Sequence, residues 1–188
     1  MDLFYSMGAA GTVNNQNSSI GCYVGLGLKQ DKISMRGDVG TDLSAKGGCP
    51  ALFTKGTISY NSDDGDVNAD NGFFANGSAQ FETGIGMRTV DYGYGYESDE
   101  FGVINYGKTL SAELGYRLNP NYSGTHTNLS VFADSSTFNN QVNNTYGAKG
   151  EISDGNKSMF TKVGIQKNEK DTKPYIGIGA KINLTAGL

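Results

Sequence analysis

The sequence predicts an all-β protein organised as one domain over residues 1–188, and three observations carry that prediction. Its 28 glycines, against 3 prolines, are spread through segments that otherwise look ordered, where each would cost a helix about 1 kcal/mol relative to alanine. Apolar and polar residues alternate with period two, and no long segment has helical periodicity. Short clusters of Asn, Asp, Gly and Ser separate these segments, as turns separate strands.

The alternating segments predict ten strands, and we expect a barrel of 8 to 10 strands from them. They lie near residues 2–12, 19–30, 32–43, 52–60, 73–90, 101–118, 126–138, 145–153, 157–167 and 174–188. Three of these segments, 73–90, 101–118 and 174–188, hold 15 to 18 residues and exceed the usual length of strands in globular sheets. Such lengths suit a tilted crossing of a bilayer with a projecting end.

Each strand has an apolar and a polar face. In segment 20–28, Ile, Cys, Val and Leu occupy the even positions, whereas Gly and Tyr occupy the odd ones. Small residues dominate the polar faces, although glycine on a water-exposed strand surface only weakens the strand. A narrow lumen, in contrast, needs small residues beside a few long charged ones. We therefore favour a closed antiparallel up-and-down transmembrane β-barrel over a soluble β-barrel or sandwich that would act as a binding module.

Ten charged residues would share the lumen of such a barrel. They are Arg36, Asp38, Glu82, Arg88, Glu113, Arg117, Lys149, Glu151, Lys162 and Lys181. Enclosed charges are costly unless they neutralise one another, so we expect them to form alternating ion pairs. The first interpretation is that this network fills the lumen, and the second is that it forms the charged constriction of a narrow pore for small solutes.

This pattern resembles the small outer-membrane barrels of Gram-negative bacteria, of the OmpA/OmpX/Ail/opacity type. The closing segment 175–184 is similar to the glycine- and aromatic-bearing last strand of that family, although this chain ends in Leu188 and the family usually ends in an aromatic residue. The resemblance implies a monomer in the bacterial outer membrane, in contact with the lipid bilayer and lipopolysaccharide. It also implies adhesion, surface recognition or envelope integrity through the outward loops.

The resemblance also implies which end faces outward. Both termini would lie in the periplasm, with a tight turn at Gln30–Asp31. The outward segments would be 12–19, 44–51, 90–100, 138–145 and 168–173. Tyr92, Tyr94 and Tyr96 would then either contact an extracellular protein or glycan or anchor the barrel at the membrane interface.

The two cysteines fall on that same outward side. Cys22 and Cys49 are the only thiols of the chain, and no further cysteine or nearby histidine accompanies them as in a zinc site. A disulfide between them is one expectation, and two unpaired thiols are the other.

Other function classes find little support in the sequence. The net charge of −4 and the lack of a basic cluster argue against nucleic acid as a partner. His126 is followed by Asn128 where a His–Ser membrane hydrolase would need serine, and no GxSxG, P-loop or HExxH motif occurs, so we expect no enzyme. The acidic segment 63–70 lacks the glycine and glutamate of a calcium loop, and we expect neither a metal nor a cofactor.

The first residues of the sequence also lack the pattern of a signal peptide.

Overall fold

The computed structural model describes residues 1–15, 18–44, 50–62, 71–91, 97–118, 125–138 and 140–187. These residues form ten antiparallel strands. They are β1 (Asp2–Asn14), β2 (Ser18–Gln30), β3 (Ile33–Ser44), β4 (Pro50–Asn61), β5 (Gly72–Asp91), β6 (Glu97–Leu118), β7 (Thr125–Phe138), β8 (Gln141–Asp154), β9 (Lys157–Asn168) and β10 (Thr172–Gly187). Within the described ranges, no helix is long and apolar enough to cross a membrane.

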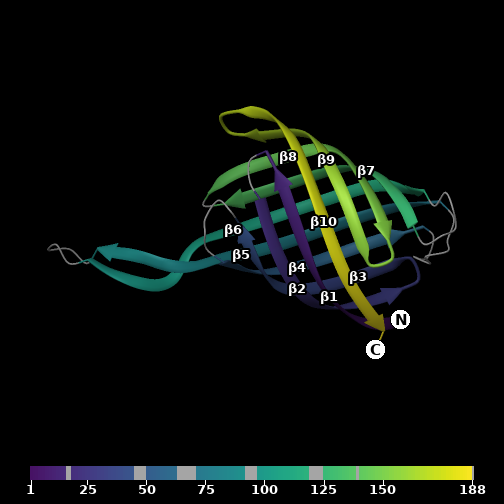
Figure 1. Ribbon diagram of the computed structural model, residues 1–188, viewed down its shortest axis with the longest axis horizontal. Coiled ribbons are helices and arrows are strands. Elements are labelled where there is room, and N and C mark those ends of the chain that lie inside the picture. Colours follow the sequence, from purple (N-terminus) through teal and green to yellow (C-terminus); the bar gives the residue numbers. More distant parts are fainter. Residues whose placement is uncertain are drawn as a thin grey trace.

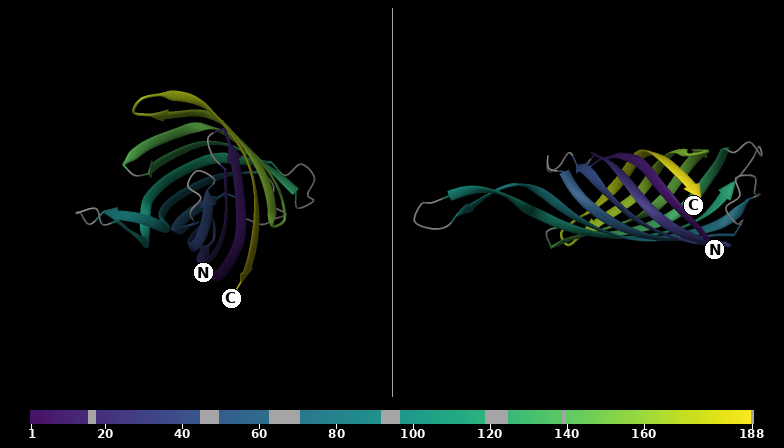
Figure 2. Two further views of the ribbon diagram at one scale, coloured as in Figure 1. Left: turned by 60° about the vertical axis from the view of Figure 1, so that its left-hand side comes forward. Right: turned by 90° about the horizontal axis from the view of Figure 1, so that it is seen from below.

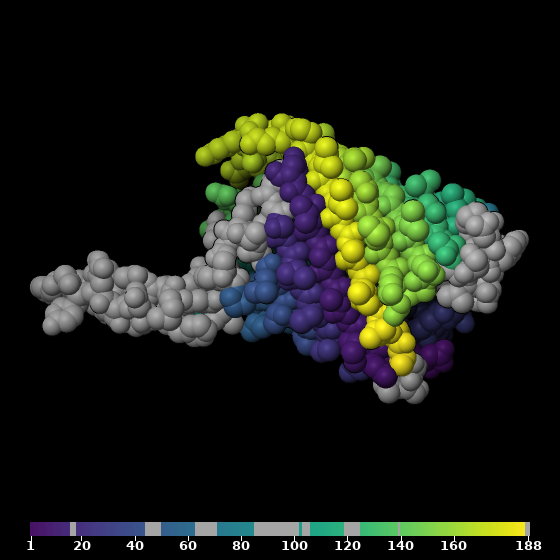
Figure 3. Space-filling view, viewed as in Figure 1, coloured from purple at the N-terminus to yellow at the C-terminus, as the bar shows by residue number. Residues whose placement is uncertain are grey.

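The ten strands close into a single up-and-down barrel. Every strand pairs with its neighbours in the chain, and β1 pairs with β10 from Phe4–Gly187 to Asn14–Gly177. β1 (purple) and β10 (yellow) lie side by side along this seam (Figure 1, Figure 3). Closure pairs the strands that would otherwise be sheet edges. The predicted closed antiparallel barrel is confirmed, with ten strands.

Both termini lie at one end of the barrel (Figure 1). The turns at this end are short where β2 meets β3 and where β8 meets β9. Asp31 and Gly155 have φ angles of +49° and +56° in these turns, the left-handed conformation that tight hairpin turns require. The tight turn expected at Gln30–Asp31 is therefore present.

β5 and β6 continue past the rim at the opposite end (Figure 2). Pairing of β5 with β4 ends at Gly84, and pairing of β6 with β7 ends at Gly107. The two strands still pair with each other from Ile85–Val103 to Asp91–Glu97, after a register shift at Gly84/Ile85. We call residues 85–103 the projecting hairpin. At about 3.4 Å per residue, it extends the sheet by roughly 24 Å beyond its last lateral neighbours.

Side-chain burial in the barrel is the reverse of that in a soluble protein. The most buried side chain is Ser6, whereas Leu26 is 61% and Ile178 is 55% exposed. The side chains of Arg36 and Glu113, in contrast, are each only 18% exposed. The apolar faces therefore lie on the outer surface and do not pack against one another in a core, as a soluble sandwich would require.

Glycines on the inner face leave room for larger side chains of the next strand. A Cβ atom at Gly27 would lie 2.2 Å from the Phe4 ring, so the ring occupies the space that a side chain would need. Phe160 covers Gly179 in the same way. The small residues of the polar faces thus accommodate inward-pointing rings as well as charges.

Candidate functional site

The lumen encloses a cavity of about 470 Å³. Ser34, Asn61 and Arg117 line it near the strand ends on the side of the termini, so the cavity reaches toward that end. Its charged lining consists of six cations and three carboxylates, drawn from strands all around the barrel. The cations are Arg36, Lys55, Arg117, Lys149, Lys162 and Lys181, and the carboxylates are Glu113, Asp134 and Glu151.

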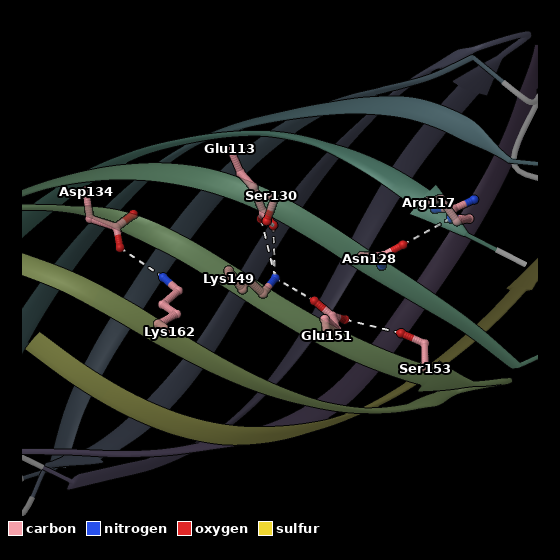
Figure 4. A network of polar contacts seen from close by, with 9 residues as sticks. All are labelled: Glu113, Arg117, Asn128, Ser130, Asp134, Lys149, Glu151, Ser153 and Lys162. Atoms are coloured by element: carbon pink, nitrogen blue, oxygen red, sulfur yellow. Dashed lines mark hydrogen bonds and ion pairs between the residues drawn. The ribbon is translucent and has the colours of Figure 1, made fainter.

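One side of the lumen, formed by β6 to β9, carries a connected network (Figure 4). Lys149 Nζ lies 3.2 Å from Glu113 Oε1 and 2.5 Å from Glu151 Oε2. Ser130 Oγ donates a hydrogen bond of 2.5 Å to Glu113, and Ser153 Oγ donates one of 3.3 Å to Glu151. One ammonium therefore holds two carboxylates, and a hydroxyl supports each of them.

A second ion pair lies beside this network. Lys162 Nζ of β9 is 2.9 Å from Asp134 Oδ2 of β7 and 4.3 Å from the centre of the Phe132 ring. The ring face adds a favourable interaction with the cation. The residues of these two groups are called the paired wall: Glu113, Asp134, Lys149, Glu151 and Lys162.

The other side of the lumen, formed by β3, β4 and β10, has a different charge pattern. Arg36 Nε donates to Asp38 Oδ2 at 2.9 Å, and its guanidinium lies 5.3 Å from the centre of the Tyr23 ring. Lys55 of β4 and Lys181 of β10 line the same cavity. Neither ammonium has a hydrogen bond or an ion pair with any residue that the structure describes. Arg36, Lys55 and Lys181 are called the cationic wall.

Several sequence-predicted residues lie outside both walls. Arg117 bridges strands, with Nε 3.4 Å from Asn128 Oδ1 and Nη2 3.4 Å from Asn61 Oδ1. Glu82 accepts a hydrogen bond of 3.3 Å from Gln80 and does not line the cavity. The backbone of Arg88 pairs with Glu100 in the projecting hairpin, past the last pairing of β5 with β4 at Gly84, and its side chain lies outside what the structure describes.

Of the two expectations for the cysteines, the disulfide is wrong. Cys22 is a free thiol that is exposed on the outer face of β2, with its Sγ 3.5 Å from Thr41 Oγ1 of β3. The period-two alternation directs this side chain to the apolar surface of the wall. Cys49, Tyr92, Tyr94 and Tyr96 lie outside the described residues.

Sequence reasoning missed two charged residues of the site, Lys55 and Asp134. Both occupy inward positions of alternating strands: the odd positions 51 to 61 of β4 read Ala, Phe, Lys, Thr, Ser and Asn, and Asp134 follows Phe132 by two in β7. Assigning the inner face of all ten strands, and not of five, would have identified them. Their partners across the lumen depend on strand register, which alternation alone does not give.

The comparisons with known proteins concern the barrel as a whole. No protein-family model and no curated protein sequence matches the chain. Among solved structures, the beta domain of the Bordetella autotransporter Brka is similar, with a TM-score of 0.43, 10% identity and coverage of 97% of this chain and 99% of that one. The N-terminal beta-barrel domain of Pseudomonas aeruginosa OprF has a TM-score of 0.40 and 8% identity, with coverage of 96% and 97%. Likeness of this degree carries no functional argument, and the resemblance to the OmpA/OmpX/Ail/opacity type is not confirmed.

Proposed function

We propose that this chain is an integral β-barrel of the bacterial outer membrane, monomeric and without catalytic activity, which acts through the end opposite its termini. The observation that supports this most directly is a belt of exposed apolar side chains to which every strand contributes. It includes Leu3, Met7, Val24, Leu26, Val39, Leu52, Ile58, Phe81, Leu110, Leu114, Val131, Ile152, Val163, Ile178 and Leu184. Leaving such a side chain in water rather than in hydrocarbon costs about 1.5–3 kcal/mol, so an aqueous environment would strongly disfavour this surface.

Aromatic side chains near both ends of the belt fit the two interfaces of a bilayer. At the end of the termini, Tyr60 and Phe73 are exposed, and the Phe73 ring packs edge-on against Tyr116 with centroids 4.8 Å apart. Toward the opposite end, Tyr106 and Phe138 are exposed. Tyr and Phe rings prefer the level of the lipid headgroups, and the chain has no tryptophan to take this place.

The projecting hairpin supports a role in surface contact. If the termini face the periplasm, the hairpin stands on the outer face of the membrane, beyond the barrel rim (Figure 1). A two-stranded extension that has lost its lateral neighbours adds nothing to barrel closure and stands beyond the barrel rim. We assign to it adhesion or surface recognition, with lipopolysaccharide, an extracellular protein or a glycan as the partner class.

Extraction and electrophoresis of the full chain test the membrane assignment. We expect the protein to sediment with the outer-membrane fraction and to need detergent for extraction. We also expect the folded form to migrate differently from the boiled form on a gel, because a closed barrel resists unfolding by the gel detergent. Recovery of the folded protein from the aqueous fraction without detergent would overturn the assignment.

Cysteine labelling in intact cells tests the orientation. In a background with Cys22→Ser and Cys49→Ser, we expect Ser98→Cys in the projecting hairpin to react with a membrane-impermeant maleimide. The matched control is Lys157→Cys in the β8–β9 turn region at the opposite end, which we expect to react only after the outer membrane is permeabilised. The reverse labelling pattern would place the hairpin in the periplasm and contradict a role at the cell surface.

A narrow pore is the second candidate, and the 470 Å³ cavity favours it. Charged rings in a confined lumen select and slow ions. Recordings from planar bilayers distinguish the two roles: discrete conductance steps that disappear when the protein is denatured support a pore, whereas a silent bilayer containing folded protein supports a filled lumen.

A further inference from the structure

Positive charge is concentrated on one side of the lumen cavity. Six cationic side chains line it against three carboxylates, and Asp38, which holds Arg36 from just outside the lining, adds a fourth. Charges enclosed in a low-dielectric wall are stable only when they are neutralised nearby. Two further carboxylates of the inner faces, Asp42 and Glu82, lie outside this lining, so the excess of cations is local: on the cationic wall, Arg36, Lys55 and Lys181 have only the carboxylate of Asp38 beside them.

The three cations of this wall act on one another across the cavity. Arg36 and Lys55 both repel the Lys181 ammonium, and Glu151 is the carboxylate that attracts it. Glu151 already holds Lys149 directly. Lys55 is the cross-strand neighbour of Asp38, whose Oδ2 is bound to Arg36, and it is also attracted by Asp134, which is bound to Lys162. Among the described residues, therefore, neither ammonium is in direct contact with a carboxylate.

A hydroxyl at the same place also lacks a partner. Thr57 lines the cavity on β4, directly across from Arg36 in the β3–β4 register. Its Oγ1 atom is buried and has no hydrogen-bond partner in the part of the chain that the structure describes. A buried polar atom without a partner is uncommon in native structures and often marks a position where a water or an ion binds. Thr57 Oγ1 can donate a hydrogen bond to an anion in this cavity.

We propose that the cationic wall, together with Thr57, binds a small divalent oxyanion of the phosphate class in the lumen. Such an ion brings negative charge to the ammonium groups of Lys55 and Lys181 and offers several oxygen atoms at once to donors from β3, β4 and β10. Ammonium and guanidinium groups form their strongest hydrogen bonds with such oxygens. The inference requires the closed barrel but not the surface role of the hairpin.

Binding of inorganic phosphate to the detergent-solubilised full chain tests this proposal. Titration calorimetry gives the dissociation constant, with sodium chloride at matched ionic strength as the reference and sulfate as a second divalent oxyanion. Each protein is first checked for heat-modifiable migration, so that loss of the barrel is distinguished from loss of the site. We expect the wild type to bind phosphate and sulfate saturably. We expect no saturable binding in the sodium chloride reference titration.

Single substitutions then locate the site. Lys55→Met and Lys181→Met each remove one charge at similar side-chain length, and we expect the dissociation constant for phosphate to rise about tenfold in each. Thr57→Val removes the hydroxyl alone and is expected to weaken binding by about fivefold. The matched control, Lys157→Met, removes an exposed cation outside the cavity lining and should leave binding unchanged.

Two results would overturn the proposal. The first is a folded wild-type barrel that shows no phosphate binding beyond the chloride reference. The second is equal loss of binding in Lys157→Met and Lys181→Met, which would mean that phosphate responds to the net charge of the protein and not to the cationic wall.

Discussion

The two walls of the lumen differ in whether their enclosed lysines form ion pairs. On the paired wall, Lys149 lies between Glu113 and Glu151, and every charged group has an oppositely charged neighbour within 4.0 Å (Figure 4). On the cationic wall, Lys55 and Lys181 face the same cavity without such a neighbour among the described residues. The residue type is the same on both sides. The position of carboxylates, and not the lysine itself, decides whether the charge stabilises the barrel.

The largest effect is expected from the paired wall. Lys149→Met leaves the carboxylates of Glu113 and Glu151 enclosed without their ammonium, and we expect the free energy of unfolding to fall by about 3–5 kcal/mol. Urea unfolding of the barrel from lipid vesicles, followed by circular dichroism, measures this change.

A compensated variant shows whether the loss comes from the orphaned charges. The triple substitution Lys149→Met, Glu113→Gln and Glu151→Gln removes all three charges and should recover most of the lost stability. A triple variant no more stable than Lys149→Met alone would mean that the network contributes through packing, and the contrast between the walls would lose its electrostatic basis.

The second effect tests the close packing of Gly25 of β2 against Asp38, the carboxylate that holds Arg36 of the cationic wall. A Cβ atom at Gly25 would lie 2.0 Å from Asp38 Oδ1 and 2.7 Å from the Gly37 carbonyl oxygen. Gly25→Ala must therefore displace the carboxylate that holds Arg36, and we expect a loss of about 1–3 kcal/mol in the same unfolding experiment.

The matched control for Gly25→Ala is Gly56→Ala on the outer face of β4. Apart from its own residue and its two chain neighbours, no atom of the described residues lies within 4 Å of the position that its Cβ would take. We expect a change of about 0.5 kcal/mol or less, or a small gain from the more restricted unfolded chain. Equal losses at the two positions would show that the inner glycine is not needed for the close approach of Asp38.

The sequence predicted the wall of the barrel better than its interior contacts. Period-two alternation puts Leu26 and Glu113 on opposite faces of the wall, and the small residues of the polar face indicate that Glu113 lies inside. It does not reveal that Lys149 of β8 reaches Glu113 of β6, because this contact crosses β7 and depends on the registers of both the β6–β7 and β7–β8 pairs. Alternation also does not reveal where β5 loses β4 as a neighbour, at Gly84, because the pattern continues unchanged across that point.

A smaller loss is expected at the isolated pair of the paired wall. Lys162 and Asp134 are 22% and 25% exposed, so their interaction is partly screened by solvent. Lys162→Met should lower the free energy of unfolding by about 1–2 kcal/mol, less than Lys149→Met, because only one carboxylate is orphaned. Asp134→Asn added to Lys162→Met should restore part of this loss, and a double variant less stable than either single one would contradict an ion-pair origin.

The smallest effect has the opposite sign and separates the walls most clearly. Lys181→Met removes an enclosed cation that has no carboxylate of its own, so in phosphate-free buffer the free energy of unfolding should stay the same or rise by up to about 1 kcal/mol. Adding inorganic phosphate should then stabilise the wild type but not the variant, because a ligand that binds only the folded state raises its stability. The order of stability of the two proteins would reverse between the two buffers. If Lys181→Met instead loses stability without phosphate, as Lys149→Met is expected to, the ammonium of Lys181 is neutralised within the barrel and the two walls do not differ.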